Sequence, residues 1–301
     1  MRQLRYFVAV AEEGQLTTAA QKLHVAQPTL SHAIAQLETR LGVELLRRNH
    51  RGATLTPAGE VLLTKARAAI EAADDAALAA RSLARAGRGV LRFGFLGIPP
   101  SEKAPGLFAR FHASHAGVEI AFRELGFPSP STAAWLADVD IALCFSPTPH
   151  PDVEICALRA EPRLVLASQE HRLAGCEEAT VADVLEETYL GCHPSVDPTW
   201  AGFWRLDDHR GKPPERVTPD EPSSAWEMLA LVPSGRGITT VARSSATLVP
   251  EVIPGLTLIP LSDANPAVLA FTYRKDTCNP LVNAFVALAQ SPELKSRSHS
   301  A

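Results

Sequence analysis

The 301-residue chain has neither a pattern of paired cysteines nor a long hydrophobic run. Its five cysteines are an odd number, lie far apart and include no C-x-x-C pair. This argues against a disulfide framework and a zinc site, and favours a reducing compartment. No segment reaches the roughly 18 uninterrupted apolar residues of a membrane span. After the basic start, Glu12 and Glu13 stand where a signal peptide would be cleaved. We therefore expect a cytoplasmic protein without metal or cofactor.

Motifs for catalysis and for phosphate binding are also missing. Gly235-Arg236-Gly237 lacks the third glycine of a dinucleotide-binding loop and precedes a strand pattern, not a helix. Asp140 lies beside a predicted strand, but no serine in a nucleophile-elbow context accompanies it. Cys176 and Cys192 fall in the same predicted part of the chain, 162–265, so a switch in which peroxide oxidises a cysteine is conceivable. No motif supports such a switch. We expect no enzymatic activity.

Charge is unevenly distributed along the chain. Residues 1–59 carry seven Lys/Arg and four Asp/Glu, a net charge of +3, so the remainder carries −7 to give the total of −4. A small basic module on an acidic body is typical of a protein that meets phosphates at one end only. Ordinary surface variation explains an excess of this size equally well.

Apolar positions at three- and four-residue steps predict three short helices in the first 42 residues. Gly14 ends the first, 24–26 form the turn before the third, and Gly42 ends the third. Pro28 suits a first helical turn, where its missing N–H is no loss. The third helix opens on small polar side chains, which favours entry into a DNA groove. Its predicted buried stripe is Leu30, Ile34, Leu37 and Leu41, and its outward residues are Thr29, Ser31, His32 and Gln36.

A wing and a long helix are predicted next. Two extended pieces flank the turn Asn49-His50-Arg51-Gly52. Thr56-Pro57 and Glu60 are typical of a helix start. From Val61 to about Ala86 the chain has no Pro or Gly and is rich in alanine. An isolated helix with so few large apolar residues would bury little apolar surface. A second copy of the helix is the simplest partner that would cover it, and a lone solvated linker helix is the alternative. The near-heptad stripe is Leu62, Ala66, Ala69 or Ile70, Ala73, Ala76 or Ala77, Ala80 and Leu83.

After Gly87-Arg88-Gly89, strand and helix patterns alternate, which implies parallel sheets with right-handed crossovers. We expect two α/β lobes connected twice, near 160–162 and 262–266, with a ligand cleft between them. The tail after Gln290 is predicted to be disordered. The predicted strands are 90–95, 118–122, 139–144, 163–167, 189–192, 237–241, 256–260 and 268–273, and the predicted helices are 103–115, one around 135–136, and 281–288.

The chain resembles the LysR-type transcriptional regulators over nearly its whole length, more strongly in its N-terminal part. The residues that carry the resemblance are Leu4-Arg5-Tyr6-Phe7, Thr17-Thr18-Ala19-Ala20, the run from Leu23 to Ser31, Leu37-Glu38, Leu41-Gly42, Leu55-Thr56-Pro57-Ala58-Gly59 and, more weakly, Leu91-Arg92-Phe93-Gly94, Asp140-Ile141-Ala142-Leu143 and Gly235-Arg236-Gly237-Ile238. The resemblance implies an α/β protein with a winged helix-turn-helix at 1–58, a linker and dimerisation helix at 59–88, and a two-lobed effector-binding domain like a periplasmic binding protein at 89–301. Lobe I would hold 89–161 and 266–301, and lobe II 162–265.

The resemblance also implies a function. The chain would be a sequence-specific DNA-binding regulator of transcription, controlled by a small-molecule inducer bound between the lobes. Its partners would be double-stranded DNA, the effector and further copies of itself, as a dimer and a tetramer, and RNA polymerase is a further candidate. A small-molecule-binding or solute-binding protein without DNA-regulatory activity is the alternative, against which the first 59 residues and the absent signal peptide count.

Residue by residue, the resemblance places Arg51 at the minor groove, and Thr17 and Thr18 at helix-start positions that face phosphates. The residues that it places at major-groove positions are Gln27, Pro28, Thr29, Ser31 and His32. Gln27 can bridge adenine bidentately, and arginine suits a narrow A·T minor groove. His32 departs from the family, which usually has arginine there, so its base preference is in doubt, or it contacts no base. Arg47 and Arg48 are expected to contact phosphate or to brace the wing, and not to read the sequence. The expected DNA-binding set is Thr17, Thr18, Gln27, Pro28, Thr29, Ser31, His32, Gln36, Arg48 and Arg51.

The effector residues transfer less securely, because the loops of the family vary with each inducer. Ser101 matches a segment that often binds an inducer carboxylate, although a simple helix cap explains it as well. Phe127 and Phe145 indicate a partly aromatic pocket, or belong to the core. The expected effector-binding set is Pro99, Pro100, Ser101, Gly126, Phe127, Phe145, Ser146, Cys192 and His193.

Overall fold

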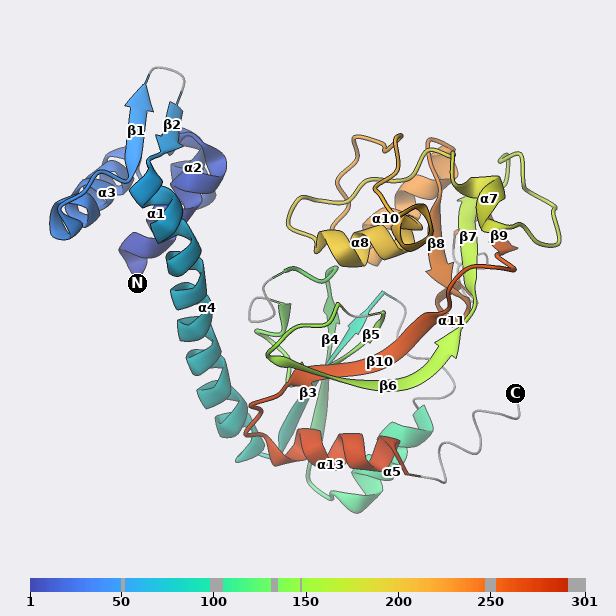
Figure 1. Ribbon diagram of the computed structural model, residues 1–301. Coiled ribbons are helices and arrows are strands. Elements are labelled where there is room, and N and C mark those ends of the chain that lie inside the picture. The colour runs from blue at the N-terminus through green and yellow to red at the C-terminus, as the bar shows by residue number, and fades with distance from the viewer. Residues whose placement is uncertain (50–51, 98–104, 131–134, 147, 247–252, 292–301) are drawn as a thin grey trace. The chain divides into compact units, whose positions relative to one another are not determined.

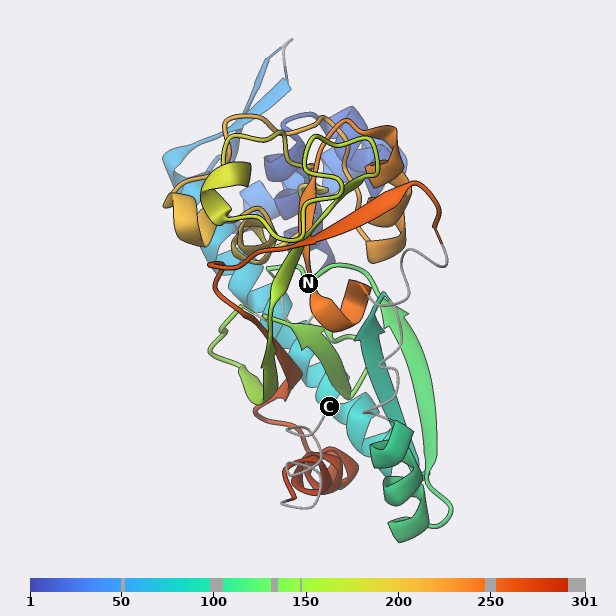
Figure 2. The same cartoon turned by 90° about the vertical axis from the view of Figure 1, so that its right-hand side faces the viewer.

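The computed structural model describes residues 1–49, 52–97, 105–130, 135–146, 148–246 and 253–291 (Figures 1 and 2). The chain forms two compact units, Met1–Leu78 and Ala79–Ala301. Helix α4 (Pro57–Ala86) begins in the first and ends in the second. Among the described residues, no helix is both long and apolar enough to cross a membrane.

Three helices and a two-stranded wing make up the first unit: α1 (Arg2–Glu13), α2 (Leu16–Lys22), α3 (Gln27–Leu41), and the antiparallel strands β1 (Leu46–Asn49) and β2 (Gly52–Leu55). As predicted, Gly14 and Gly42 end α1 and α3, both in the left-handed conformation that glycine adopts without strain. Leu30, Ile34 and Leu37 are buried in the common core.

The prediction that Leu41 completes the buried stripe is wrong. Leu41 is 47% exposed. It is the last residue of α3, and it lies one turn beyond Leu37, the last member of the stripe in the core cluster. The helix therefore extends past the body that it packs against.

The predicted start of α4 is confirmed, and its contacts explain the residues found there. The Thr56 hydroxyl accepts a hydrogen bond from the Gly59 N–H at 3.0 Å and donates to the Glu44 carbonyl at 2.7 Å. A Cβ on Gly59 would lie 2.2 Å from the Leu45 carbonyl oxygen. Glycine is thus required because the first turn of α4 packs directly against the chain that enters the wing.

Lobe I of the second unit is built on a five-stranded sheet in the order β4-β3-β5-β10-β6. Strand β3 runs parallel to β4 and β5, while β10 is antiparallel to β5 and β6. Helices α5 (Pro105–Ser114) and α13 (Pro280–Ala289) pack against it around Phe93, Phe111 and Phe285. The strands are β3 (Val90–Leu96), β4 (Glu119–Leu125), β5 (Ile141–Phe145), β6 (Val153–Glu161) and β10 (Ala267–Arg274).

Lobe II differs from the prediction, because its three-stranded sheet, β8-β7-β9, is antiparallel throughout. The predicted strand at 189–192 is also wrong: Tyr189 pairs with Val217 and Ile238 only as isolated bridges. The alternation of strand and helix patterns predicts only the order of the elements along the chain. A long connection between two strands allows them to pair in either the parallel or the antiparallel direction, so the direction could not be predicted from this pattern. The remaining elements are β7 (Arg163–Ser168), β8 (Thr239–Ala242), β9 (Leu256–Pro260), α7 (Val181–Val184), α8 (Pro198–Trp204), α9 (Asp207–Arg210), α10 (Ala225–Leu231), the 3-10 turn η1 (Val232–Ser234) and α11 (Arg243–Ala246).

Two short segments connect the sheets of the lobes. Strand β6 ends at Glu161 and β7 begins at Arg163, while β9 ends at Pro260 and β10 begins at Ala267 (Figures 1 and 2). Both connections lie where the sequence predicts them. Two neighbouring connections of this kind allow one lobe to turn against the other.

Candidate functional site

A tight turn sets α3 against α2. His24 adopts a positive φ of 51°, and the Val25 N–H donates to the Ala20 carbonyl at 3.0 Å, which ends α2 in the manner of a Schellman motif. Ala19 and Ala20 are buried, so the two helices pack closely. The start of α3 therefore lies outside the core of this unit.

The exposed start of α3 carries the polar side chains that the sequence predicts. Gln27, Pro28 and Thr29 are exposed, and Ser31 is half-buried. His32 is also exposed and lies one turn further along the helix. Side chains placed at a helix start in this way can contact base edges without moving the core.

His32 is held by a chain of hydrogen bonds. Gln3 Nε2 donates to Gln36 Oε1 at 3.2 Å, so the Gln36 amide nitrogen faces His32 Nε2 at 2.9 Å. An amide nitrogen only donates, so His32 Nε2 accepts in this arrangement, which assigns the proton of a neutral ring to Nδ1. A donor on this exposed side chain suits a base acceptor or a phosphate.

The other predicted DNA contacts lie at two further places. Thr17 and Thr18 are exposed in the first turn of α2, with Thr18 Oγ1 3.5 Å from Gln15 Oε1. In the wing, Arg48 is paired in register with Ala53. Arg51 lies outside the described residues.

A large cavity lies within the second unit, bordered by both lobes. It contains about 870 Å³ of space free of protein atoms, open solvent at its mouth included. Its lining is mainly apolar and aromatic. The lining residues are Leu96, Gly97, Phe127 and Phe145 of lobe I, and Leu166, Leu190, Cys192, Trp200, Ala201, Trp204, Arg205, Ala225, Met228, Leu229, Thr239, Thr240, Val241, Ala242 and Ser245 of lobe II.

Four aromatic rings from the two lobes meet at the cavity. The centroids of Phe127 and Trp200 are 4.8 Å apart, those of Trp200 and Trp204 5.9 Å, and those of Phe145 and Trp204 6.4 Å. Helix α8 presents both tryptophans on one side because they are four residues apart. Aromatic faces arranged in this way bind flat apolar groups.

Hydrogen bonds join the lobes beside the cavity. Trp200 Nε1 donates to the Phe145 carbonyl at 3.1 Å, and the Phe127 N–H donates to the Ser223 carbonyl at 2.7 Å. Gly97 has a φ of +64°, and a Cβ there would lie 2.8 Å from the Ala225 Cβ. Glycine is needed at this position both for its conformation and for its close approach to lobe II.

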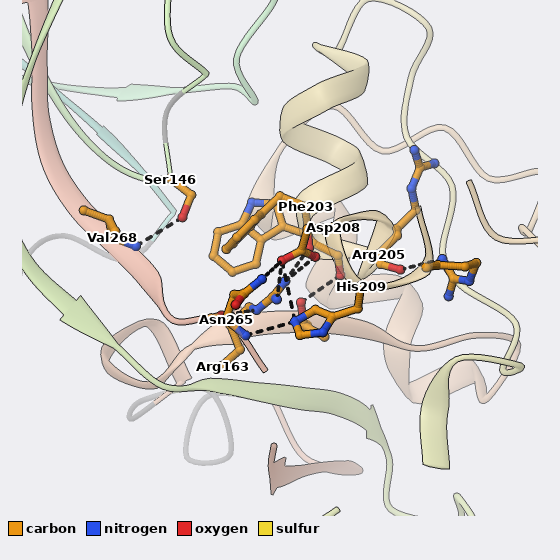
Figure 3. Close-up of polar contacts among 11 residues, drawn as sticks. Ser146, Arg163, Phe203, Arg205, Asp208, His209, Asn265 and Val268 are labelled. Atoms are coloured by element: carbon orange, nitrogen blue, oxygen red, sulfur yellow. Dashed lines mark hydrogen bonds and ion pairs between the residues drawn. The ribbon is translucent and has the colours of Figure 1, made fainter. Parts of the chain in front are cut away.

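Of the predicted effector residues, Phe127, Phe145 and Cys192 line the cavity. Gly126, Ser146 and His193 do not: the Gly126 carbonyl accepts from the Trp135 indole, Ser146 pairs with Val268 (Figure 3), and the exposed His193 bonds Ser195. Each of these three has a local partner instead. Pro99, Pro100 and Ser101 lie outside the described residues.

Sequence reasoning missed three large side chains of the lining, Trp200, Trp204 and Arg205. One signal was available. The chain has four tryptophans, and two of them lie four residues apart behind the helix start Asp197-Pro198. Thr239 and Thr240 lie in the predicted strand 237–241, but nothing in the sequence marked them as lining residues.

The thiol of Cys192 is poorly suited to redox sensing. Burial raises its pKa, and the charge of Arg205 offsets that rise only in part. Burial also raises the pKa of Cys144, to about 12. The thiolate is the reactive form of cysteine, so a raised pKa slows oxidation by peroxide.

Arg163, fully buried, ties together the two connections between the lobes (Figure 3). Its Nε donates to the Asn265 carbonyl at 2.7 Å, and Nη2 donates to Asp208 at 2.8 Å. Nη1 donates to the Phe203 carbonyl at 2.6 Å, and the guanidinium lies 4.1 Å from the centre of the Phe203 ring. Burial lowers the pKa of Arg163, and Asp208 opposes this. The end of α8, which borders the cavity, is thus fixed to both connections.

Asp140 is a structural anchor for the end of α4. Its buried carboxylate accepts from Ser82 Oγ at 2.7 Å, from Arg85, and from the Arg92 N–H at 2.9 Å. Ser82 and Arg85 belong to α4, and Arg92 belongs to β3. These donors account for an acid in this position without any catalytic role.

Both parts of the chain match known families. Residues 1–60 match the model described as "Bacterial regulatory helix-turn-helix protein, lysR family", and residues 84–291 match the "LysR substrate binding domain". The chain is 29% identical to the HTH-type transcriptional regulator AlsR of Bacillus subtilis, over 100% of this chain and 99% of that protein. It is 30% identical to the uncharacterized HTH-type transcriptional regulator YnfL of Escherichia coli, over 81% and 82%. Among solved structures, an OxyR mutant of Corynebacterium glutamicum is 25% identical with a TM-score of 0.52, covering 99% of this chain and 93% of that one.

Proposed function

The chain belongs to the LysR family of DNA-binding transcriptional regulators, and we propose that its α3 reads the operator while the aromatic cavity binds the controlling small molecule. The observation that supports this most is the cavity itself, about 870 Å³ with the open solvent at its mouth, bordered by two lobes that two short segments connect. A ligand that contacts both lobes biases their relative position, which is a route to control of DNA binding.

For the DNA, we propose that base reading falls to the first turns of α3. Gln27 presents an amide able to bond adenine at two positions, and the methyl group of Thr29 suits thymine. His32 would offer its Nδ1 proton to a base acceptor or a phosphate. Thr17, Thr18 and Arg48 are assigned to phosphates, and Arg51 to the minor groove. Pro28, Ser31 and Gln36 complete the proposed surface.

Replacing Gln27 with alanine should weaken binding to the operator by about 1–3 kcal/mol and leave binding to random DNA unchanged, because only a base contact is lost. Competition binding at one fixed salt concentration measures this. The operator is taken from a footprint on fragments flanking the protein's own gene. Arg48→Ala is the matched variant: a lost phosphate contact weakens binding to both DNAs alike. Equal losses for Gln27→Ala on the two DNAs would remove it from base reading.

We also propose that α4 pairs with a second copy. Leu62 and Ala66, two members of the predicted stripe, pack instead in the core of the first unit. On another side of the helix Val61 is 67% exposed and Leu83 is 55% exposed. The exposed alanines between them recur at four-residue steps: Ala68, Ala72, Ala76 and Ala80. Small side chains let two helices approach closely, and a second α4 would cover the two large apolar residues.

Filling the cavity should abolish the response to effector while DNA binding persists. Ala201 is buried in the lining on α8, so Ala201→Phe places a ring where the ligand would lie. We expect the operator affinity of the free protein to be unchanged and the effector-induced change in footprint to be lost. Ala230→Phe, at an exposed position of α10, is the control. A full response from Ala201→Phe would place the effector elsewhere.

We also propose where this regulator acts and on what. A regulator that reads duplex DNA works in the cytoplasm, without catalytic turnover, and RNA polymerase is the machinery whose access it changes. Release of a small molecule, not its conversion, would then end the signal.

A further inference from the structure

We propose that the cavity takes a flat aromatic molecule with a single carboxylate, which Arg205 and Trp204 bind. This inference rests on the proposed role of the cavity as the effector site and specifies the chemistry of the ligand. It starts from two buried polar side-chain atoms that have no hydrogen-bond partner among the described residues.

Those atoms belong to consecutive residues that both line the cavity. Trp204 Nε1 and Arg205 Nε are buried and have no hydrogen-bond partner in the part of the chain that the structure describes. The neighbouring indole differs, because Trp200 Nε1 donates to the Phe145 carbonyl. Buried donors without acceptors are costly and uncommon, so each of these atoms favours an acceptor supplied from outside the protein.

The charge of Arg205 is balanced only in part by the acids next to it in sequence. Burial raises the pKa of Asp207 and the charges of Arg205 and Arg210 both lower it, so Arg205 shares this carboxylate with Arg210, which lies 3.2 Å from it. Asp208 lies 2.8 Å from Arg163. Figure 3 shows the Arg205 guanidinium pointing away from the cluster around Arg163. Within the described ranges, no carboxylate lines the cavity. An anion is therefore the complementary ligand.

The charge of Arg205 also acts on Cys192, another residue that lines the cavity. Burial raises the pKa of the Cys192 thiol, and Arg205 lowers it against that rise. Arg205 thus acts at the cavity wall that Cys192 forms. The guanidinium can pair with a carboxylate through two parallel hydrogen bonds.

The remaining lining determines the body of the ligand. Phe127, Phe145 and the two tryptophans offer ring faces, and the hydroxyl of Thr240 is already bonded to the Trp204 carbonyl at 2.8 Å. A sugar or a polar amino acid would lose hydrogen bonds with water here and find few replacements. One cation matches one carboxylate, whereas a phosphate dianion would bring a second negative charge into an apolar wall.

The test compares two probes of one shape, 1-naphthoate and its neutral amide, 1-naphthamide. Isothermal titration calorimetry on the full chain at pH 7.5 should show the naphthoate binding at least about tenfold more tightly, as expected of a charged hydrogen bond. Arg205→Gln should remove this preference while it leaves the affinity for the amide within about twofold. Trp204→Phe, which deletes the indole donor and keeps a ring, should weaken the naphthoate. Arg88→Gln, an exposed arginine, is the control.

Several results would overturn the inference: equal affinities of the two probes for the wild type, a preference that survives Arg205→Gln, or no binding of naphthoate at millimolar concentration. Ala201→Phe separates this from failure of the proposed function. If both probes bind equally and Ala201→Phe blocks both, the cavity remains the ligand site and only the anionic class is wrong. If Ala201→Phe leaves binding intact, both proposals fail. Thermal unfolding without ligand checks each variant, and Val241→Phe replaces Ala201→Phe if that variant unfolds early.

Discussion

Asp140→Ala should lower the free energy of unfolding of the second unit by about 3–5 kcal/mol, because it leaves a buried arginine without its counter-ion. The Arg85 side chain is only 11% exposed and its partner is fully buried. Ser82 Oγ and the Arg92 N–H lose the same acceptor. Differential scanning calorimetry of the full chain measures the loss as an earlier transition.

A matched control lies two residues away in the chain. Asp138 pairs with Arg123, but these side chains are 54% and 53% exposed. Exposed pairs contribute about 0–1 kcal/mol, so Asp138→Ala should leave the transition almost unchanged. The end of α4 would also be freed in Asp140→Ala, so its amide protons near Ser82 should exchange faster. Similar effects of the two substitutions would contradict the anchoring role.

Asp208→Ala should destabilise the same unit by a comparable amount, about 3–5 kcal/mol, since Arg163 is fully buried and loses its only close carboxylate among the described residues. Chemical denaturation followed by circular dichroism measures it. The exposed pair of Lys212 and Glu215 provides the control, Glu215→Ala.

A double substitution distinguishes lost charge balance from lost packing at this cluster. Replacing a buried ion pair by apolar residues of similar size is often neutral. Arg163→Met combined with Asp208→Leu should therefore recover part of the stability that Asp208→Ala loses. The same double variant removes the hydrogen bonds to Phe203 and Asn265, so its response to effector should be weaker even where its stability is restored. A double variant less stable than Asp208→Ala would show that packing, not charge, dominates here.

The helix-turn-helix could be predicted closely from the sequence because its signals are local. Glycines at the helix ends, Thr56 before Pro57 and a three- to four-residue apolar period act over one or two turns. The missed elements depend on distant pairing. Strand β6 was not predicted, because it is an edge strand whose apolar residues alternate imperfectly. Strand β7 was predicted, but its antiparallel direction was not, because its partners come to it across long connections.

The two candidate sites also differ in how far local sequence signals predict them. Outward residues of α3 follow from the helical period, once the buried stripe is known. The cavity does not follow from any period, because Phe127, Trp200 and Thr239 come together only when the two lobes fold. Arg205 carries no motif at all, and its relevance appears only when its buried Nε is seen to lack a partner among the described residues.

Placing two of four indoles at the cavity has a practical consequence. Trp200 and Trp204 line it, while Trp226 is 41% exposed elsewhere and the Trp135 indole donates to the Gly126 carbonyl. A molecule entering between those rings would displace water from them and change their emission. The protein thereby carries its own spectroscopic reporter, and candidate metabolites can be screened by intrinsic fluorescence without any label.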